Sequence, residues 1–437
     1  SLIMDHDKFA LVEKILKDID NIMTKNAELY AFDIVPVESN FQNKSPVLHL
    51  ENCLGLESWC VKHVYMYCYS ELMDKYFGKG KRKVVKVSSE RLTKLLNVTL
   101  LLNPELCTLW NKRRDLVLRN DLQRSSELRF TKLVLSRKPK CNDAFSYRRW
   151  LLDTILSNNY IDSLVNEELG ICQLSADKSP NNYHSWSHRM WMLQRLKFLR
   201  QYNLNLLYMK EYDFSEHWVS KHISDYSCFH YRQFCIKNVS TIDTDSVWKS
   251  LNDYIHINLR NSLVRVLMTN SQDDSLAKMM EKDLLSYSED NLLSTLLVNS
   301  YRSCNCNVNN FVTCRKLEIL FHELNSNNEL LRFYRCHETL WYHRRFVVQE
   351  ILAVMYEHFG LQKCNGILVK YVCKKCKSDF VEKQAKIIRY DSNWIYSSML
   401  FKVLLSHERK FIEEMRANGD NYAERHDKYL KYIQGIN

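Results

Sequence analysis

The feature that most constrains the fold is a short pattern, an aromatic residue followed three places later by arginine, which occurs five times. The copies are Trp110 with Arg113, Phe145 with Arg148, Trp186 with Arg189, Phe229 with Arg232, and Trp341 with Arg344. Successive aromatic residues are 35, 41, 43 and 112 residues apart, and a proline stands six places before the aromatic residue in the first three copies. Such a recurrence is typical of a repeat protein, in which each unit is one supersecondary element.

Each unit divides into two predicted helices. Between Arg91 and Leu102, apolar residues recur at the spacing of one helical face. Asn103 and Pro104 then end this helix, because a residue before proline resists the α conformation. In the third copy, Trp186, Met190, Leu193 and Leu196 follow one helical face, and Ser179 or Asn182 is a candidate N-cap. Antiparallel hairpins of this kind must stack on one another, because none buries its apolar face alone.

The composition supports a helical chain. Eight glycines and five prolines are about 3% of the 437 residues, against roughly 12% in average proteins. The turns of a β-sandwich or barrel depend on these two residues. We therefore expect an all-α fold.

Charge, cysteines and hydropathy define the class of protein more loosely. The net charge of +11 suits anionic partners such as diphosphates, but nucleic-acid binding rests on charge alone and is not expected. The 15 cysteines are scattered and often have apolar neighbours, as at Cys60, Cys68, Cys172 and Cys235, which is typical of buried thiols in a reducing compartment. No signal peptide or membrane span is recognisable. We expect a cytoplasmic protein with no stable membrane insertion.

The two motif residues have different predicted roles. The aromatic ring fills the space between hairpins, and the arginine hydrogen-bonds carbonyls or a carboxylate. In three copies a second arginine follows the first, at Arg114, Arg149 and Arg345. Successive helical residues point about 100° apart, so one arginine can serve the core while its neighbour faces a partner.

The residues of these units resemble a known repeat. Asn103-Pro104 followed by Trp110-Asn111 and Arg113-Arg114, and then Asn182-Tyr183-His184 before Trp186, are similar to the alpha-subunit repeat of the protein prenyltransferases. The resemblance extends to the runs 54–62 and 224–234. It implies a right-handed superhelical crescent of stacked hairpins. We expect an N-terminal segment with the first helices at 1–89, core repeats at 90–240, a helical region with insertions at 241–330, and C-terminal repeats with a cap at 331–437.

The same resemblance implies a function. The chain is expected to be the alpha subunit of a heterodimeric protein geranylgeranyltransferase, a third type that pairs with the beta subunit of Rab geranylgeranyltransferase. Zinc and geranylgeranyl diphosphate are expected on that beta subunit, with a cysteine-containing protein as substrate. No complete catalytic site and no metal site are expected in this chain. Because residues 434–437 lack cysteine, the chain is not expected to accept a prenyl group itself.

A few residues are candidates for reaching the lipid diphosphate. The resemblance places a lysine before the motif of a middle repeat, where the second unit has Lys140 and the third has Asn181 instead. Tyr183 and His184 follow in the third unit, and a cation or phenol donor there stabilises negative charge on leaving oxygens. The residues expected to carry the repeat signature or the partner interface are Trp110, Asn111, Arg113, Arg114, Arg148, Arg149, Trp186, Arg189, His230, Tyr231, Arg232, Trp341, Arg344 and Arg345.

Other interpretations remain open at this point. A non-enzymatic helical-repeat scaffold for protein–protein interaction is the main alternative. The single Cys373/Cys376 pair lacks a second pair for zinc. The basic run 79–86 is expected to be a solvated loop. Trp394 has Ser397 in the arginine position and suggests a divergent terminal unit.

Overall fold

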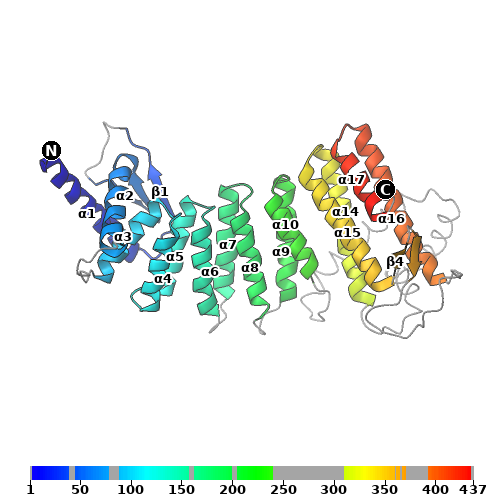
Figure 1. The fold of residues 1–437 in the computed structure, drawn as a ribbon, viewed down its shortest axis with the longest axis horizontal. Helices are drawn as coiled ribbons and strands as arrows, with labels where there is room; N and C mark the ends of the chain where they lie inside the picture. Colours follow the sequence, from blue (N-terminus) through cyan, green and yellow to red (C-terminus); the bar gives the residue numbers. More distant parts are fainter. Residues whose placement is uncertain are drawn as a thin grey trace. The chain divides into compact units, whose positions relative to one another are not determined.

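The computed structural model describes residues 2–38, 45–77, 88–156, 162–198, 204–239, 310–359, 361–364, 367–370 and 392–434. The chain forms two compact units, residues 1–200 and 201–437 (Figure 1). The four segments expected from the sequence were defined by where repeats occur, whereas the two units are defined by compactness. The four segments therefore stay predictions.

The first unit is built mainly of antiparallel helical hairpins. Its helices are α1 (Leu2–Lys25), α2 (Ser58–Leu72), α3 (Ser89–Leu102), α4 (Cys107–Leu118), α5 (Arg124–Arg137), α6 (Asn142–Leu156), α7 (Asp162–Lys178) and α8 (Tyr183–Leu196), and a π-helical turn, η1 (Met73–Phe77), extends α2. From α3 onward the helices form pairs. The first helices α3, α5 and α7 pack on one another, and so do the second helices α4, α6 and α8. This is the predicted stack of hairpins.

The second unit repeats the hairpin design. Its described helices are α9 (Leu204–Lys221), α10 (Tyr226–Asn238), α14 (Asn310–Phe333), α15 (Glu338–Phe359), α16 (Ser392–Ala417) and α17 (Tyr422–Gln434). The pairs are α9 with α10, α14 with α15, and α16 with α17, and the second helices α10, α15 and α17 pack in order. The all-α repeat fold is confirmed within each unit, whereas the right-handed crescent stays a prediction.

Local sequence explains where these helices begin and end. Helix α3 buries the predicted apolar face, and Ser88 caps its start by accepting a hydrogen bond from the Arg91 amide at 3.2 Å. Asn103 has extended backbone angles before Pro104, so the helix stops as predicted. The carbonyl of Pro104 then accepts hydrogen bonds from the Trp110 indole, at 2.8 Å, and from the Cys141 thiol, at 3.6 Å. The Pro104 carbonyl therefore links the α3–α4 turn to the α5–α6 turn.

Two small sheets were not predicted. In the first, β3 (Cys53–Glu57) lies between β1 (Ala31–Val35), which is parallel to it, and β2 (Val47–Leu50), which is antiparallel. Gly55 lies in the central strand, where an added Cβ would approach Val35 to 3.2 Å and Leu48 to 3.3 Å. The second is a hairpin of β4 (Leu361–Cys364) and β5 (Ile367–Lys370). Strands this short leave little alternation in the sequence to detect.

Candidate functional site

The first arginine of each motif is buried, and in four of the five motifs it binds a glutamate of the next described hairpin. Arg113 on α4 donates to both carboxylate oxygens of Glu127 on α5, at 2.7 and 2.6 Å, and to the Asn97 side chain at 2.7 Å. Arg148 on α6 binds Glu168 on α7 in the same way, at 2.7 and 2.6 Å. The planar guanidinium matches two carboxylate oxygens at once. These arginines therefore link successive hairpins.

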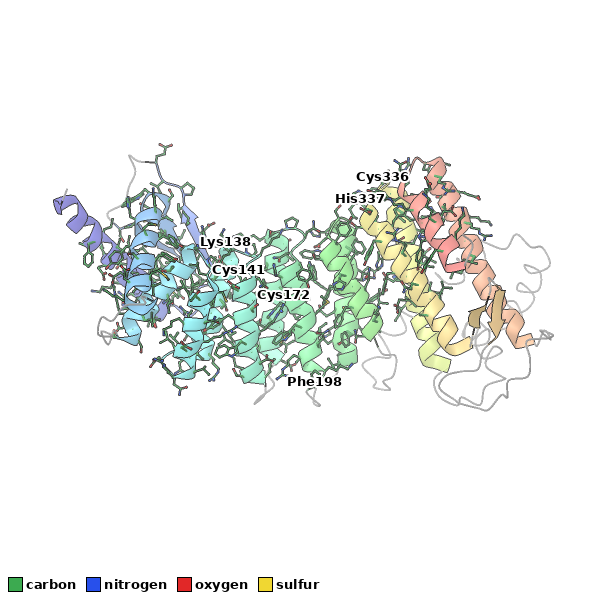
Figure 2. All side chains as sticks on the ribbon, viewed as in Figure 1. Lys138, Cys141, Cys172, Phe198, Cys336 and His337 are labelled. Atoms are coloured by element: carbon green, nitrogen blue, oxygen red, sulfur yellow. The ribbon has the colours of Figure 1, made fainter. Side chains whose placement is uncertain are left out.

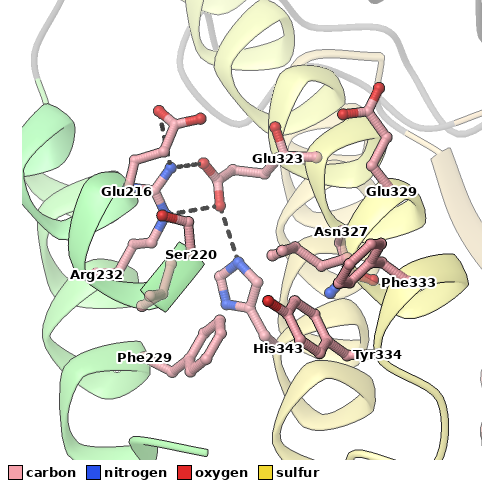
Figure 3. A pocket seen from close by; sticks show the side chains of 13 residues that line it. Glu216, Ser220, Phe229, Arg232, Glu323, Asn327, Glu329, Phe333, Tyr334 and His343 are labelled. Atoms are coloured by element: carbon pink, nitrogen blue, oxygen red, sulfur yellow. Dashed lines mark hydrogen bonds and ion pairs between the residues drawn. The ribbon is translucent and has the colours of Figure 1, made fainter. Parts of the chain in front are cut away.

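The second unit makes the same contacts across longer stretches of sequence. Arg232 on α10 donates to Glu323 on α14 from Nε at 3.0 Å and also from Nη2 (Figure 3). Arg344 on α15 donates to Glu408 on α16 at 2.8 and 2.7 Å. Both pairs are buried. The motif thus performs one structural task in both units, as the predicted carboxylate-binding role requires.

The residue before the arginine completes each link. The Tyr147 hydroxyl donates to Glu127 at 2.6 Å, and His188 Nε2 lies 3.0 Å from Glu168. Equivalent contacts join Tyr231 to Glu211 and His343 to Glu323, the latter at 2.9 Å. In helix α17, His426 contacts Glu408 at 2.7 Å in the same way, although Asp427 rather than an arginine follows it. Each such glutamate therefore receives a tyrosine or histidine from its own hairpin. We call the arginine, the glutamate and this third residue together a rung, and the set of rungs the arginine ladder.

Electrostatics keeps three ladder glutamates, Glu168, Glu323 and Glu408, ionised. Burial alone would raise the pKa of Glu168, but the Arg148 guanidinium and the hydrogen bond from His188 outweigh it and hold that pKa at about 2. The pKa values of Glu323 and Glu408 are lowered for the same reasons. Breaking such a buried pair by removing one partner typically costs about 3–5 kcal/mol. The ladder is thus a structural element sensitive to single substitutions.

Sequence reasoning missed the glutamates of the ladder. Glu127, Glu168, Glu211 and Glu323 each stand 20 residues before the tyrosine or histidine that contacts them. This fixed interval is present in the sequence and would have identified them. The aromatic-to-arginine pattern drew attention to the second helix alone, so the partner on the first helix went unnoticed.

The second arginines lie on the adjacent helix face and are only half-buried. Arg149 donates from Nε to His188 Nδ1 and from Nη2 to the Ser187 hydroxyl, both at 3.3 Å. Burial lowers the pKa values of Arg149 and Arg345. Arg114 is likewise half-buried. The first arginine of each pair is therefore buried and the second is half-buried, and contact of the second with a partner stays a prediction.

Arg149 also defines the protonation state of its ladder histidine. Nδ1 of His188 faces the Arg149 donor, while Nε2 faces the Glu168 carboxylate. The hydrogen-bond network therefore assigns a neutral ring with its proton on Nε2. Burial lowers the pKa of His188, and the two neighbouring arginines add to this effect, whereas Glu168 opposes it.

Four predicted residues come from neighbouring second helices and the turns before them: Lys140 precedes α6, Arg149 lies within α6, and Tyr183 and His184 begin α8. We call Lys140, Arg149, Tyr183 and His184 the turn cluster. In Figure 2, Lys138 and Cys141 mark the α5–α6 turn that carries Lys140. Burial lowers the pKa of His184, and the charges of Arg149 and Lys140 lower it further. The Tyr183 and His184 ring centroids are 5.7 Å apart at 76°. Tyr183 is 58% exposed, so its hydroxyl is accessible to a ligand.

The third unit has a structural reason for lacking the expected lysine. Asn181 has a φ of +54°, a left-handed conformation in which asparagine is enriched. The next residue, Asn182, is the predicted cap and accepts from the Ser185 amide at 3.2 Å. Its amide group also donates to the carbonyls of Pro139, at 2.6 Å, and Ser175, at 3.1 Å. Turn geometry and capping therefore determine the residues at this turn.

The remaining signature residues separate into core and surface. Asn111 and His230 are exposed, so they are available to a partner. Arg189 donates to the Leu169 carbonyl at 2.8 Å. The side chains that are buried are Trp110, Arg113, Arg148, Trp186, Arg189, Tyr231, Arg232, Trp341 and Arg344.

Some predicted features lie outside the described residues, namely Cys373, Cys376 and the basic run 79–86. Within the described ranges, no group of three or more His, Cys, Asp and Glu side chains is arranged to hold a metal ion. Over the same ranges, no helix is both long and apolar enough to cross a membrane. The four cysteines predicted to be buried are buried.

Comparisons with known proteins agree with the hairpin boundaries. The family model "Protein prenyltransferase alpha subunit repeat" matches residues 124–155, 165–196, 208–239 and 320–351, each a first helix plus a second helix. A protein prenyltransferase alpha subunit repeat-containing protein 1 from Danio rerio is 30% identical over 356 residues, covering 77% of this chain and 72% of the relative. The chain belongs to the protein prenyltransferase alpha subunit repeat family.

Other relatives extend this assignment. Protein prenyltransferase alpha subunit repeat-containing protein 1-B from Xenopus laevis is 29% identical over 365 residues, 79% of this chain and 74% of the relative. The geranylgeranyl transferase type-2 subunit alpha of Candida albicans is 25% identical over 186 residues, 39% of this chain and 49% of the relative. The second similarity is distant and spans less than half of each chain.

Two further hairpins share the repeat architecture outside the matched residues. The α3–α4 hairpin supplies Arg113 and Asn97, and the α16–α17 hairpin supplies Glu408 and His426. Trp394 lies on α16, a first helix, whereas the motif of every other hairpin lies on a second helix. Trp394 is therefore not the equivalent of the motif aromatic residue. Helices α16 and α17 form the last described hairpin, and its predicted role as a cap stays a prediction.

Proposed function

We propose that the chain is the alpha subunit of a heterodimeric protein geranylgeranyltransferase that acts in the cytoplasm. In this proposal it supports a zinc-bearing catalytic beta subunit, and the beta subunit of Rab geranylgeranyltransferase is the expected partner. Membership in the alpha subunit repeat family supports the role of a subunit rather than of a complete enzyme. The similarity to type-2 geranylgeranyl transferase alpha subunits favours geranylgeranyl transfer.

The turn cluster is the observation that carries the lipid-binding part of the proposal. Transfer of a prenyl group to a cysteine sulfur breaks the carbon–oxygen bond of the lipid diphosphate, and negative charge builds up on the leaving oxygens. Lys140 at the α5–α6 turn and Arg149 within α6 supply cations, and Tyr183 at the start of α8 supplies a hydroxyl donor. Donors placed where charge develops lower the barrier. We assign the zinc and most of the lipid pocket to the beta subunit.

Association with the beta subunit is the first test. The purified chain is mixed with the Rab geranylgeranyltransferase beta subunit and analysed by size-exclusion chromatography with light scattering. A one-to-one complex supports the proposal. Failure of two folded chains to associate would overturn this pairing and favour the helical-repeat scaffold instead.

A matched pair of variants tests the turn cluster within that complex. Lys140→Ala is expected to lower geranylgeranyl transfer to a cysteine-containing acceptor by about tenfold, the loss of one charged donor worth about 1.4 kcal/mol. Lys138→Ala removes an exposed lysine from the same turn and is expected to leave the rate within about twofold. Equal rates for both variants would remove Lys140 from the diphosphate site.

A further inference from the structure

A pocket of about 440 Å³ lies in the second unit, among helices α9, α10, α14 and α15. We call it the α9–α14 pocket (Figure 3). Its inner part contains the buried residues Phe229, Arg232, Glu323 and His343. Its lining also includes Phe333, 79% exposed, and Glu329, which is exposed as well. The inner polar groups of the pocket are therefore hydrogen-bonded to one another. Its outer part is aromatic and acidic.

The single arginine of the pocket is not available to a ligand. Arg232 donates to Glu323, to the Tyr212 carbonyl at 2.6 Å and to the Ser215 hydroxyl at 3.0 Å. Its Nη2 also lies 3.5 Å from Glu216. With four protein groups around it, this guanidinium is neutralised within the wall. An anionic ligand would find no free cation among the lining residues.

The lining of the pocket contains more carboxylates than permanently charged cations. Glu216, Glu323 and Glu329 line the pocket together with the one arginine, Arg232. His322 adds a hydrogen bond to Glu216 at 3.1 Å from behind the wall. The lining residue His343 likewise contacts Glu323, at 2.9 Å. With at least one of these two histidines neutral, the three carboxylates outnumber the cations. Glu216 remains one-third exposed, so part of this negative potential reaches solvent.

Aromatic side chains give the same pocket a second attraction for cations. Phe333 and Tyr334 lie side by side, with ring centroids 4.7 Å apart at 72°. An exposed ring face attracts a guanidinium or ammonium group, and the apolar Val219 and Leu330 suit the methylene stem of a long side chain. A lysine or arginine side chain matches both the charge and the apolar surface.

We propose that the α9–α14 pocket binds a lysine or arginine side chain of a partner polypeptide. The pocket belongs to the second unit, whereas the turn cluster belongs to the first, so this proposal is independent of prenyl transfer. The whole chain carries a net charge of +11, which disfavours general attraction of a basic peptide. Binding of such a peptide therefore requires a local acidic site.

The test uses the full chain and a fluorescein-labelled peptide, Gly-Ser-Lys-Arg-Lys-Arg-Ser-Gly, measured by fluorescence anisotropy. The same peptide with glutamine at its four basic positions is the control ligand. The basic peptide is expected to bind at least about tenfold more tightly, because charge and cation–π attraction are both lost with glutamine. Equal affinities would overturn the proposal.

Substitutions in the pocket test whether the basic peptide binds there. Glu329→Gln and Phe333→Ser are each expected to weaken the basic peptide about threefold, because both side chains are exposed and contribute modestly. The matched controls are Glu413→Gln on the exposed face of α16 and Phe198→Ser, whose ring is 76% exposed in the first unit. If pocket and control variants behave alike, the peptide binds elsewhere and the proposal fails.

A third variant fills the pocket from within. Ser326→Lys places a basic side chain among the lining residues and is expected to abolish binding of the basic peptide. Its thermal unfolding midpoint is compared with that of the parent to verify folding. A folded Ser326→Lys protein that binds the peptide as the parent does would contradict the assignment.

Discussion

Adjacent arginines of one motif illustrate two uses of the same side chain. Arg148 is fully buried and held by Glu168, the Leu128 carbonyl at 2.6 Å and the Thr131 hydroxyl at 2.7 Å. Arg149 is half-buried, and its hydrogen bonds go to the side chains of the neighbouring second helix. A rotation of about 100° between successive helical residues separates them. One position therefore maintains the stack, and the next presents positive charge beside the neighbouring second helix.

The largest expected effect separates the two arginines by stability. Arg148→Met leaves the Glu168 carboxylate buried without its main cation and is expected to destabilise the first unit by about 3–5 kcal/mol. Arg149→Met removes only a half-buried cation and is expected to cost under about 1 kcal/mol. Urea unfolding followed by circular dichroism measures both.

A double variant verifies the cause. Arg148→Met with Glu168→Leu removes both charges and is expected to recover much of the loss, because apolar residues of similar volume often replace a buried pair at little cost. A double variant no more stable than Arg148→Met alone would indicate that packing, rather than the uncompensated charge, dominates.

The second prediction concerns activity, for which Arg149 is expected to matter directly, whereas Arg148 dominates stability. In the complex with the beta subunit, Arg149→Met is expected to reduce geranylgeranyl transfer by about tenfold, or about 1.4 kcal/mol, since the turn cluster loses a cation. The kcat and KM for geranylgeranyl diphosphate are measured. Arg345→Met removes the corresponding second arginine far along the chain and serves as the control. Similar losses for both would point to a general loss of positive surface.

A smaller effect tests the hydrogen bonds around the buried arginine. Thr131→Val keeps the shape of the side chain but removes the acceptor of Arg148, so a loss of about 1–2 kcal/mol is expected. Ser187→Ala removes the half-buried acceptor of Arg149 and is expected to change stability by less than about 0.5 kcal/mol. Chemical denaturation of the two variants in parallel provides the comparison.

The smallest expected effect concerns pH. The pKa of His188 is lowered in the folded chain, so the unfolded chain binds more protons below the ordinary histidine value of 6.5. The contribution of this residue is fully present above that value and is lost as the pH falls below it. His188→Tyr, which copies the Tyr147 rung, is expected to reduce the fall in unfolding midpoint between pH 7 and pH 5. An unchanged pH profile would show that His188 does not govern it.

The loss of stability below pH 4.5 has a different origin from the loss that begins near pH 6.5. Glu168 has a pKa of about 2, against an ordinary value of 4.5, so its contribution is present above 4.5 and is lost as the pH falls toward 2. His188→Tyr retains this carboxylate and the Arg148 pair. The variant is therefore expected to keep the loss of stability below pH 4.5.

Periodicity made most of the helical repeat predictable. The aromatic residues and first arginines recur in one register, and the packing of hairpins demands that this register be buried. The glutamates at the 20-residue interval were equally regular but lie on helices whose apolar pattern drew no attention to them. The short strands of 4 or 5 residues carried too little pattern.

The candidate site was predictable only in part. The resemblance indicated Lys140, Tyr183 and His184, and the structure adds that Arg149 acts on the same histidine. The α9–α14 pocket had no signal in the sequence, because its walls come from segments about 100 residues apart that meet only in the folded chain. The sequence shows only that the third unit has Asn181 in place of the expected lysine. The left-handed backbone at Asn181 gives a reason for this difference.

The ladder also has a consequence for the order of folding. The arginine and glutamate of a rung are 14 or 20 residues apart in the first unit, but 91 and 64 apart in the second. The entropy of closing a loop grows with the logarithm of its length, by about 0.6 kcal/mol per doubling, so joining Arg232 to Glu323 costs about 1.3 kcal/mol more than joining Arg148 to Glu168. The rungs near the N-terminus therefore close early during synthesis, and those of the second unit close only after long stretches of chain have followed.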